Sequence, residues 1–324
     1  MTKAIRIHEA GGADKLSWDD VEVGAPGPGE LRLKQSACGL NFIDVYMRTG
    51  LYPLPELPAV LGMEGVGVVE QVGDGVDGFA AGDRVAYPMC PGGYAEARLL
   101  PAAKAVKVPD AIDDQTAAAM MLKGMTAHYL LHRTYPVQPG DAILVYAAAG
   151  GVGLILCQWG KALGATVIGC VGSEEKAELA QANGCDHPIL YRDEDIAARV
   201  REITGGEGAA VAYDSIGKAT FEASLDSLRP FGTMVTYGNA SGPVDPFSPN
   251  ILAPKGSLYV TRPTLATHTA TRELLEQGAN ALFDVVTSGT VKIATGQTYP
   301  LAETAEAHRA LEARETTGST VLLP

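Results

Sequence analysis

Hydrophobic and polar positions follow two different patterns along the chain, and the change comes near residue 125. The residues before it form short apolar runs separated by turns rich in Gly and Pro, which is typical of a compact antiparallel β domain. The strands predicted there are Ala4–His8, Leu31–Ala37, Val66–Val72, Arg84–Tyr87 and Tyr94–Leu99.

The second pattern alternates strand-length apolar runs with helical segments of roughly 10–15 residues, which indicates βαβ units on a parallel sheet. The predicted strands are Ala142–Ala147, Thr166–Val171, Pro188–Tyr191, Ala210–Tyr213, Thr233–Tyr237 and Leu258–Thr261. The predicted helices are Val152–Leu163, Glu174–Ala182, Asp195–Ile203 and Ala219–Leu228. Six strands with helices between them make one doubly wound Rossmann fold.

The C-terminal segment predicts a helix at Arg272–Ser288, a strand, a helix at Ala305–Ala313 and a last strand at Ser319–Leu323. This segment is too short to build a core of its own, so we expect it to return to the first domain. We therefore predict an α/β protein of two domains. Residues 1–124 together with 264–324 form a catalytic domain, and residues 125–263 form a dinucleotide-binding domain.

A glycine-rich loop, Ala147–Gly153, follows the first strand of the second domain and opens its first helix. Ala148, Gly150 and Gly153 fill the glycine positions of G-x-G-x-x-G, with Ala in place of the first Gly. In this motif glycines let the backbone approach a pyrophosphate and let the helix pack on the strand, while the helix N-terminus faces the phosphates. A tight turn without a ligand also needs glycine. The strand, helix and next strand nevertheless fall where the nucleotide motif requires them.

The end of the second strand of this domain indicates which nucleotide binds. NAD-binding folds usually carry Asp or Glu there to hold the ribose diol, whereas this chain has Gly172 and Ser173. Gly172 leaves room for a 2′-phosphate, Ser173 can donate a hydrogen bond and Lys176 adds positive charge. Tyr191 follows the next strand and can lie beside the same phosphate. Ser173 also suits a helix N-cap, and Glu174 is an alternative ligand for the diol. We predict NADPH.

Charge and composition narrow the range of partners. The net charge is −13 and Lys and Arg are not clustered, so nucleic acid and anionic membranes are not expected partners. The five Cys are odd in number and lie mostly in apolar runs, which favours a reduced cytoplasmic protein over a disulfide-bonded one. The first residues lack an apolar signal segment, and no apolar run reaches about 18 residues. We expect a cytoplasmic location and a small-molecule substrate.

Several short stretches together resemble the medium-chain dehydrogenase/reductase superfamily. Gly62–Gly67, Gly82–Val85 and the glycine loop resemble the superfamily as a whole. The resemblance sharpens to its quinone oxidoreductase branch, the zeta-crystallin-like group, through Asn41–Tyr46, Gly50–Pro53, Leu122–Ala127, Tyr237–Gly242 and Tyr259–Pro263. It covers the whole chain, and it implies that the catalytic domain is a GroES-like, mostly antiparallel β-barrel.

The resemblance also implies which residues surround the cofactor. Asn41, Tyr46 and Tyr52 are the substrate-pocket candidates, and the tyrosines can donate to an acceptor oxygen or stack on its ring. Tyrosines beside Pro-rich turns are also often simple packing residues, and no residue is assigned as a certain catalytic group. The predicted cofactor-binding residues are Asn41, Tyr46, Lys123, Thr126, Tyr129, Gly150, Gly151, Val152, Gly153, Gly172, Ser173, Lys176, Tyr191, Ser215, Tyr237, Gly238, Asn239 and Arg314.

The metal positions of the superfamily carry other residue types in this chain. Where its zinc alcohol dehydrogenases place ligands, this sequence has Asn41, Met63 and Leu122–Gly124, so a tetrahedral site cannot be assembled. Cys90 has no nearby cysteine for a structural zinc, and Cys38 is interpreted as a small core residue. The six histidines are interpreted as scattered surface or core residues. No metal is expected.

The expected chemistry follows from the expected lack of zinc. Without a metal nothing polarises an alcohol, whereas a quinone is already a strong hydride acceptor and mainly has to be held near the nicotinamide. The sequence predicts a zinc-independent NADPH:quinone oxidoreductase acting on a small quinone or another electrophilic carbonyl acceptor. Two alternatives stay open, an NADPH-dependent enal or enone reductase and a cofactor-binding structural or RNA-binding protein. The apolar edge strand Leu258–Thr261 predicts a homodimer with a continuous sheet.

Overall fold

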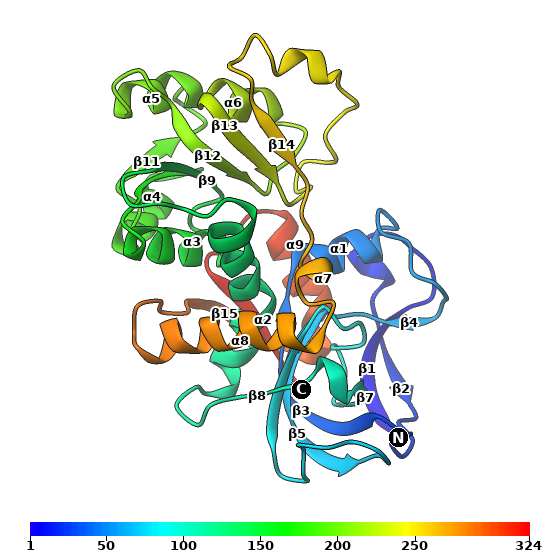
Figure 1. Cartoon of the computed structure of the whole chain (residues 1–324). Coiled ribbons are helices and arrows are strands. Elements are labelled where there is room, and N and C mark those ends of the chain that lie inside the picture. The colour runs from blue at the N-terminus through cyan, green and yellow to red at the C-terminus, as the bar shows by residue number, and fades with distance from the viewer. The chain divides into compact units, whose positions relative to one another are not determined.

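The computed structural model describes residues 1–324 and places them in two units. Unit 1 contains Met1–Met125, Thr269–Thr287 and Ile293–Pro324, and unit 2 contains Thr126–His268 and Ser288–Lys292. Both chain ends lie in unit 1 (Figure 1).

Two short segments that the sequence assigned to the catalytic domain, 264–268 and 288–292, lie in unit 2. The first is held there because the His268 ring stacks on the ring of Tyr129, with centroids 4.3 Å apart. The second is held because the Gln158 side chain bonds both the backbone N–H and the carbonyl of Lys292. Ring stacking and side-chain bonds over long sequence separations have no periodic signal, so the apolar pattern did not show them.

Unit 2 is built around a six-stranded parallel sheet in the order β11-β10-β9-β12-β13-β14. The strands are β9 (Ala142–Tyr146), β10 (Thr166–Val171), β11 (His187–Leu190), β12 (Ala209–Asp214), β13 (Leu228–Thr236) and β14 (Tyr259–Thr261). The helices are α3 (Gly151–Ala162), α4 (Glu174–Ala182), α5 (Ile196–Ile203), α6 (Phe221–Asp226) and α7 (Leu265–His268), with the 3₁₀ turn η4 (Pro249–Ile251) and the π-helical turn η3 (Leu130–Thr134). Figure 1 shows α3 and α4 on one face of the sheet and α5 and α6 on the other, the doubly wound arrangement predicted.

The order of these strands decides where a ligand can bind. All six residues of β12 are buried, as expected for a central strand covered on both faces. The first strand, β9, lies between β10 and β12, so the chain winds outward in both directions from it. Ligands of doubly wound sheets bind outside the carboxyl ends of the strands at this switch point. A ligand is therefore expected at the loops after β9, β10, β12 and β13.

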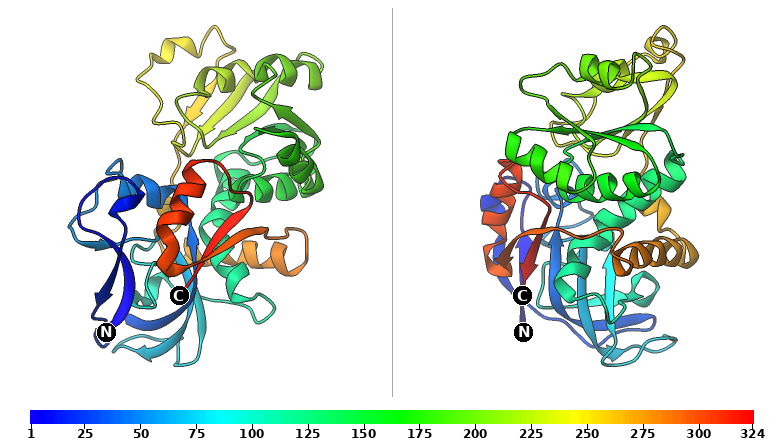
Figure 2. Two further views of the ribbon diagram at one scale, coloured as in Figure 1. Left: turned by 180° about the vertical axis from the view of Figure 1, so that it is seen from behind. Right: turned by 90° about the vertical axis from the view of Figure 1, so that its left-hand side faces the viewer.

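Unit 1 is mostly antiparallel. One sheet has the order β15-β16-β3-β5-β6-β8 with β7 paired to β3, and a second has the order β2-β1-β4. The strands are β1 (Thr2–Ile7), β2 (Ser17–Val21), β3 (Glu30–Leu40), β4 (Ala59–Val60), β5 (Glu64–Val72), β6 (Arg84–Pro88), β7 (Ala97–Pro101), β8 (Val106–Lys107), β15 (Thr295–Pro300) and β16 (Ser319–Leu323). The helices are α1 (Phe42–Arg48), α8 (Arg272–Thr287) and α9 (Thr304–Glu312), with 3₁₀ turns η1 (Ala13–Lys15), η2 (Ala102–Lys104) and η5 (Leu301–Glu303). The last strand, β16, pairs with β3, so the C-terminal segment does return to the first unit (Figure 2).

One long helix, α2 (Asp114–Tyr129), was not predicted from the sequence. Its residues Ala117–Met121 are all buried in succession, so the helix carries no apolar stripe with a period of 3.6 residues. Gly124 lies inside it because a Cβ there would meet Leu282 Cδ1 of α8 at 2.4 Å. The glycine permits close packing of two helices instead of marking a turn. No helix of the chain combines the length and the apolar character needed to cross a bilayer.

Candidate functional site

The loop between β9 and α3 makes a tight backbone turn. Ala147 has a left-handed φ of 50°, and Gly150 is the N-cap of α3 without any side-chain cap. A Cβ on Gly153 would lie 2.2 Å from the Ala147 carbonyl oxygen, so only glycine lets the helix start this close to the strand. The first N–H groups of α3 therefore lie open at the carboxyl end of β9, an arrangement that suits a phosphate.

The four residues predicted for a 2′-phosphate come together at the ends of β10 and β11. A Cβ on Gly172 would meet the Tyr191 hydroxyl oxygen at 2.8 Å, which places the tyrosine directly against the glycine. Ser173 is the N-cap of α4, and its hydroxyl accepts a hydrogen bond from the Lys176 backbone N–H at 3.4 Å. The capping role and a place beside an anion are compatible, because an N-cap serine lies where a helix attracts negative charge.

The loops that follow β12 and β13 lie in direct backbone contact at Gly238 and Ser215. A Cβ on Gly238 would lie 2.3 Å from the Ser215 carbonyl oxygen. Burial raises the pKa of the Tyr237 hydroxyl, although a hydrogen bond with the Ser215 side chain acts in the opposite direction. Asn239 follows directly and completes this group of four predicted residues.

A residue that the sequence analysis did not single out, Asp214, fixes the loop after β12. Its fully buried carboxylate accepts hydrogen bonds from the backbone N–H groups of Ile216 and Gly217 at 2.8 and 3.0 Å and from the Thr220 hydroxyl at 2.7 Å. An aspartate at the end of a strand followed by Ser and Gly is a turn signal that could have indicated it. Asp214 orders the loop that carries Ser215.

The remaining predicted residues of unit 2 lie at the C-terminal end of α2. Thr126 and Tyr129 are both buried, and the Tyr129 hydroxyl is hydrogen-bonded to the Thr126 side chain. Burial raises the pKa of this tyrosine, so it stays protonated and can donate a hydrogen bond.

Unit 1 contains a buried charged cluster at the remaining site positions. The Glu64 carboxylate, which is fully buried in β5, accepts bonds from the Lys123 ammonium at 2.8 Å, the Asn41 amide at 2.8 Å and the Leu122 backbone N–H at 2.6 Å. Lys123 and Asn41 are each only 6% exposed. A carboxylate with three donors holds both predicted site residues in fixed positions.

A second buried carboxylate, Asp44 on α1, adjoins this cluster. It accepts hydrogen bonds from the Asn41 backbone N–H at 2.8 Å and from the Tyr94 hydroxyl at 2.6 Å, and its other oxygen has no partner. Burial raises the pKa of Asp44 to about 7, assisted by the charge of Glu64 and opposed by the two hydrogen bonds and by Lys123. Only the capping spacing Asn41-x-x-Asp44 could have indicated this residue, which was not predicted.

The three other candidates of unit 1 are Tyr46, Tyr52 and Arg314. The rings of Tyr46 and Tyr52 meet edge to face with centroids 5.3 Å apart, and the Tyr52 N–H bonds the Tyr46 carbonyl. Tyr46 is buried, with 8% of its surface exposed. Arg314 follows α9 with a left-handed φ of 62° and is exposed.

The positions at which the resemblance to the superfamily places zinc ligands carry a polar amide, a buried thioether and an ammonium, at Asn41, Met63 and Lys123. No three His, Cys, Asp or Glu side chains gather anywhere in the chain in a way that could hold a metal ion. Cys38 is fully buried and its thiol donates to the Gly93 carbonyl, and burial raises its pKa to about 12. It behaves as a core residue, as interpreted.

The interpretation of the histidines as scattered is wrong for one pair. His128 and His132 are four residues apart, and their ring centroids lie 5.1 Å apart beside Trp159. The H-x-x-x-H spacing in the sequence would have found them.

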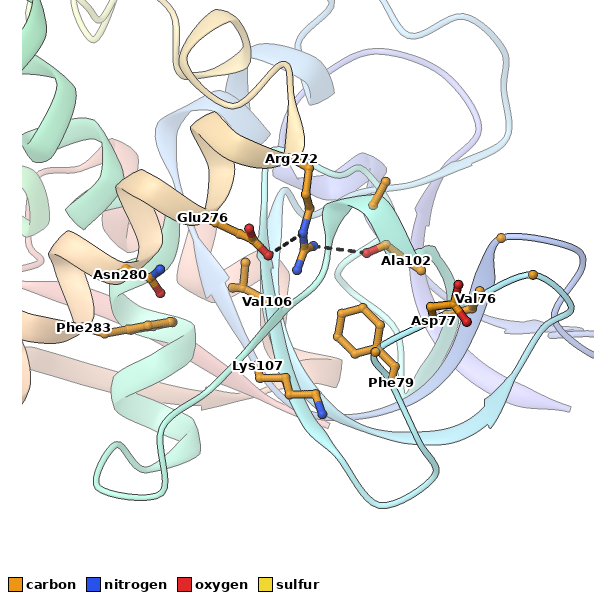
Figure 3. A pocket seen from close by; sticks show the side chains of 14 residues that line it. Val76, Asp77, Phe79, Ala102, Val106, Lys107, Arg272, Glu276, Asn280 and Phe283 are labelled. Atoms are coloured by element: carbon orange, nitrogen blue, oxygen red, sulfur yellow. Dashed lines mark hydrogen bonds and ion pairs between the residues drawn. The ribbon is translucent and has the colours of Figure 1, made fainter.

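A pocket of about 690 Å³ opens elsewhere in unit 1 and contains none of the predicted site residues. Figure 3 shows the pocket between the loop that carries Phe79 and the helix α8, which carries Arg272, with Lys107 of β8 below it. Arg272 is fixed by Glu276 at 2.7 Å and by the backbone carbonyls of Ala102 and Ala105. The Arg272 guanidinium is thus already paired, Lys107 is paired with Asp83 at 2.8 Å, and the pocket residues are separate in sequence from the loops described above.

Comparison with known proteins decides the family. The alcohol dehydrogenase GroES-like domain matches residues 27–110, and the zinc-binding dehydrogenase domain matches residues 151–280. A quinone oxidoreductase of Pseudomonas aeruginosa is 51% identical over 325 residues, which is 100% of both chains. The chain belongs to the quinone oxidoreductase branch of the medium-chain dehydrogenase/reductase superfamily.

Two further comparisons support this family assignment. A 2-haloacrylate reductase of a Burkholderia species is 49% identical over 331 residues, covering 100% of this chain and 99% of the relative. The crystal structure of Escherichia coli quinone oxidoreductase complexed with NADPH matches with a TM-score of 0.98 and 46% identity, covering 99% of this chain and 100% of that one. The predicted family and the fold class, a Rossmann domain with a GroES-like domain, are confirmed, and the chain is an oxidoreductase.

Proposed function

We propose that this chain is a zinc-independent, NADPH-dependent reductase of small quinones. The observation that carries the proposal is the buried Lys123–Glu64 ion pair, with 2.8 Å between Nζ and Oε1. It puts an ammonium group at a position where the superfamily's zinc enzymes hold a metal ligand. An ammonium cannot ligate a divalent cation and repels it at short range. Quinone oxidoreductases that are 51% and 46% identical to this chain support quinones as the class of acceptor.

The residues of unit 2 fit NADPH. Gly150 and Gly153 give the close turn and the open helix start that a pyrophosphate requires. Gly172, Ser173 and Lys176 gather with Tyr191 at the end of β10, where the 2′-phosphate of a dinucleotide lies in a Rossmann fold. The NADPH complex of the Escherichia coli relative supports the same cofactor.

Bound NADPH supplies the hydride. The chain itself contributes polar side chains in fixed positions. Glu64 holds Asn41 and Lys123 in place, and we propose that both contact the nicotinamide part of the cofactor. Tyr46 and Tyr52 form an edge-to-face pair that suits a planar acceptor. With no residue assigned as an obligatory acid, turnover should follow the electrophilicity of the acceptor itself.

A second acceptor class is favoured by one observation. The Burkholderia relative, at 49% identity, is a 2-haloacrylate reductase, and a haloacrylate is an alkene conjugated to a carboxyl group. Such an alkene accepts hydride for the same electronic reason as a quinone. Reduction of conjugated enals or enones is therefore the alternative to quinone reduction.

The experiment that tests the function is NADPH oxidation over a panel of acceptors, with enzyme treated exhaustively with a chelator. Simple ortho- and para-quinones should turn over at an undiminished rate after chelation, and unactivated ketones or primary alcohols should not react. Turnover of enals without quinones would favour the alkenal reductase. Binding of NADPH with no turnover of either class would favour a structural role. Stoichiometric zinc that leaves together with activity would contradict zinc independence.

Replacing Lys176 tests the 2′-phosphate site. Lys176→Ala should raise KM for NADPH by about 10- to 100-fold, because a charge-assisted hydrogen bond contributes roughly 1.5–3 kcal/mol. KM for NADH, which lacks the phosphate, should hardly change. The matched control is Lys161→Ala, another exposed lysine of unit 2, which pairs with Asp186. If the unmutated enzyme preferred NADH, Glu174 would be the ribose ligand and the assignment would be wrong.

The edge of the unit 2 sheet supports a homodimer. β14 ends the sheet, Tyr259 on it is 59% exposed, and the neighbouring Phe231 is 68% exposed. An open apolar edge is normally covered, and a second copy can pair with it across a two-fold axis. Light scattering at micromolar concentration should give the mass of a dimer, and Val260→Pro should shift it to monomer. A monomeric unmutated protein would rule this interface out.

A further inference from the structure

Three aromatic side chains of unit 2 form a cluster that the proposed function does not use. His128 lies near the end of α2, and His132 lies in the π-helical turn that follows it. Their ring centroids are 5.1 Å apart and their planes differ by 36°. Trp159 of α3 lies 5.8 Å from the first ring and 5.1 Å from the second, so it closes one side of the pair.

The pair has the chemistry of metal ligands. The spacing H-x-x-x-H puts two imidazoles on one helix face, which is the spacing that zinc peptidases use for two of their ligands. The Nε2 atom of His132 is buried and has no hydrogen-bond partner. A buried ring nitrogen without a partner is costly, and a bound ion or water would relieve that cost.

We propose that His128 and His132 form a two-imidazole site for a divalent transition-metal ion of the class that imidazole prefers, Zn²⁺, Ni²⁺ or Cu²⁺. No third His, Cys, Asp or Glu joins them in a metal-binding group, so water completes the coordination and the ion is exchangeable. The nearby charged or titratable groups are Arg133, which is exposed, and His268, which stacks on Tyr129. The position that holds the general base of zinc peptidases is occupied here by Tyr129, so the site carries no hydrolytic activity.

This site is independent of the proposed reduction of quinones, because none of its residues belongs to the zinc positions of the superfamily. Chelation should therefore empty it without lowering quinone turnover. The two conclusions fail separately: loss of turnover after chelation contradicts zinc-independent reduction, whereas absence of metal binding contradicts only the histidine site.

Calorimetric titration with NiCl₂ tests binding. The chelator-treated, unmutated protein should bind one Ni²⁺ per chain, and His128→Gln or His132→Gln should lower the affinity by at least about tenfold, since even the loss of an outer-shell partner has that effect. His187→Gln is the matched control, because His187 is a single exposed histidine of the same unit. Binding that survives both ligand substitutions, or that is lost in the control, would overturn the proposal.

Two spectroscopic measurements use the unmutated protein and so do not depend on how the variants fold. Cu²⁺ at one equivalent should give an electron paramagnetic resonance spectrum with coupling to two nitrogens. Added Zn²⁺ should shift the ring signals of His128 and His132 in a ¹H–¹⁵N spectrum and leave those of the other four histidines in place. Coupling to a single nitrogen, or shifts that fall on other histidines, would show that the pair does not bind a metal.

Discussion

Glu64→Gln should lower the free energy of unfolding of unit 1 by about 3–5 kcal/mol, the usual cost of removing one partner of a buried ion pair. Glu64 is fully buried and Lys123 is 6% exposed, so the lysine ammonium would be left without its carboxylate. The amide also has one acceptor oxygen for the three donors that the carboxylate now serves.

The two tryptophans of the chain allow the unfolding of unit 1 to be measured separately. Trp18 lies in unit 1 and Trp159 in unit 2, so Trp18 fluorescence in a Trp159→Phe background follows the urea unfolding of unit 1 alone. The matched control is Glu70→Gln on the same strand, whose partial exposure and bond to Arg32 predict a loss of about 0–1 kcal/mol. The double variant Glu64→Gln with Lys123→Met should be more stable than Glu64→Gln alone. Equal losses at Glu64 and Glu70 would show that the buried pair contributes no more than a surface pair.

The unit 2 fold could be predicted from the sequence because its signals are local. β10 and α4 have the predicted bounds, as does β16 of unit 1, since an apolar run with a clear turn on each side marks a strand or a helix by itself. Gly153 could be assigned for the same reason: its neighbours in the turn are its neighbours in the chain. Helix α1 was missed because it has only seven residues, too few for a periodic pattern.

The chemistry of unit 1 could not be predicted, because its contacts join distant parts of the chain. Asn41 and Lys123 were named only through the resemblance to a family, and nothing local indicates that Glu64 bonds both, 23 and 59 residues away. Tyr94 reaches Asp44 over 50 residues. Whether a carboxyl group of this kind is charged depends on its burial, and burial is a property of the folded chain alone.

The stability of unit 1 should fall as the pH rises, because of Asp44. The pKa of its carboxyl is raised by burial from 3.8 to about 7, so between these values the folded protein holds a proton that the unfolded chain has lost. The stabilisation that comes from protonated Asp44 is therefore fully present below pH 3.8 and disappears as the pH rises through 7. Each pH unit in this window lowers the free energy of unfolding by about 1.4 kcal/mol, a total on the order of 4 kcal/mol.

Asp44→Asn isolates this effect. The amide resembles the neutral acid and still accepts from the Asn41 backbone N–H and the Tyr94 hydroxyl, so the variant should lack the pH dependence. Urea unfolding followed by Trp18 in the Trp159→Phe background, at each pH from about 5 to 8, should show the protein with Asp44 losing stability relative to Asp44→Asn up to about pH 7 and then running parallel to it.

The control for this titration is Asp113→Asn. Burial raises the pKa of Asp113, but hydrogen bonds from Thr116 outweigh it and the net shift is downward. The stabilisation by charged Asp113 is therefore lost only at low pH. Between about pH 5 and 8, the free energies of unfolding of Asp113→Asn and of the protein with Asp113 should differ by a constant amount. If the curves with and without Asp44 were parallel over that same range, Asp44 would be charged in the folded state. The buried cluster would then hold two carboxylates against the single ammonium of Lys123.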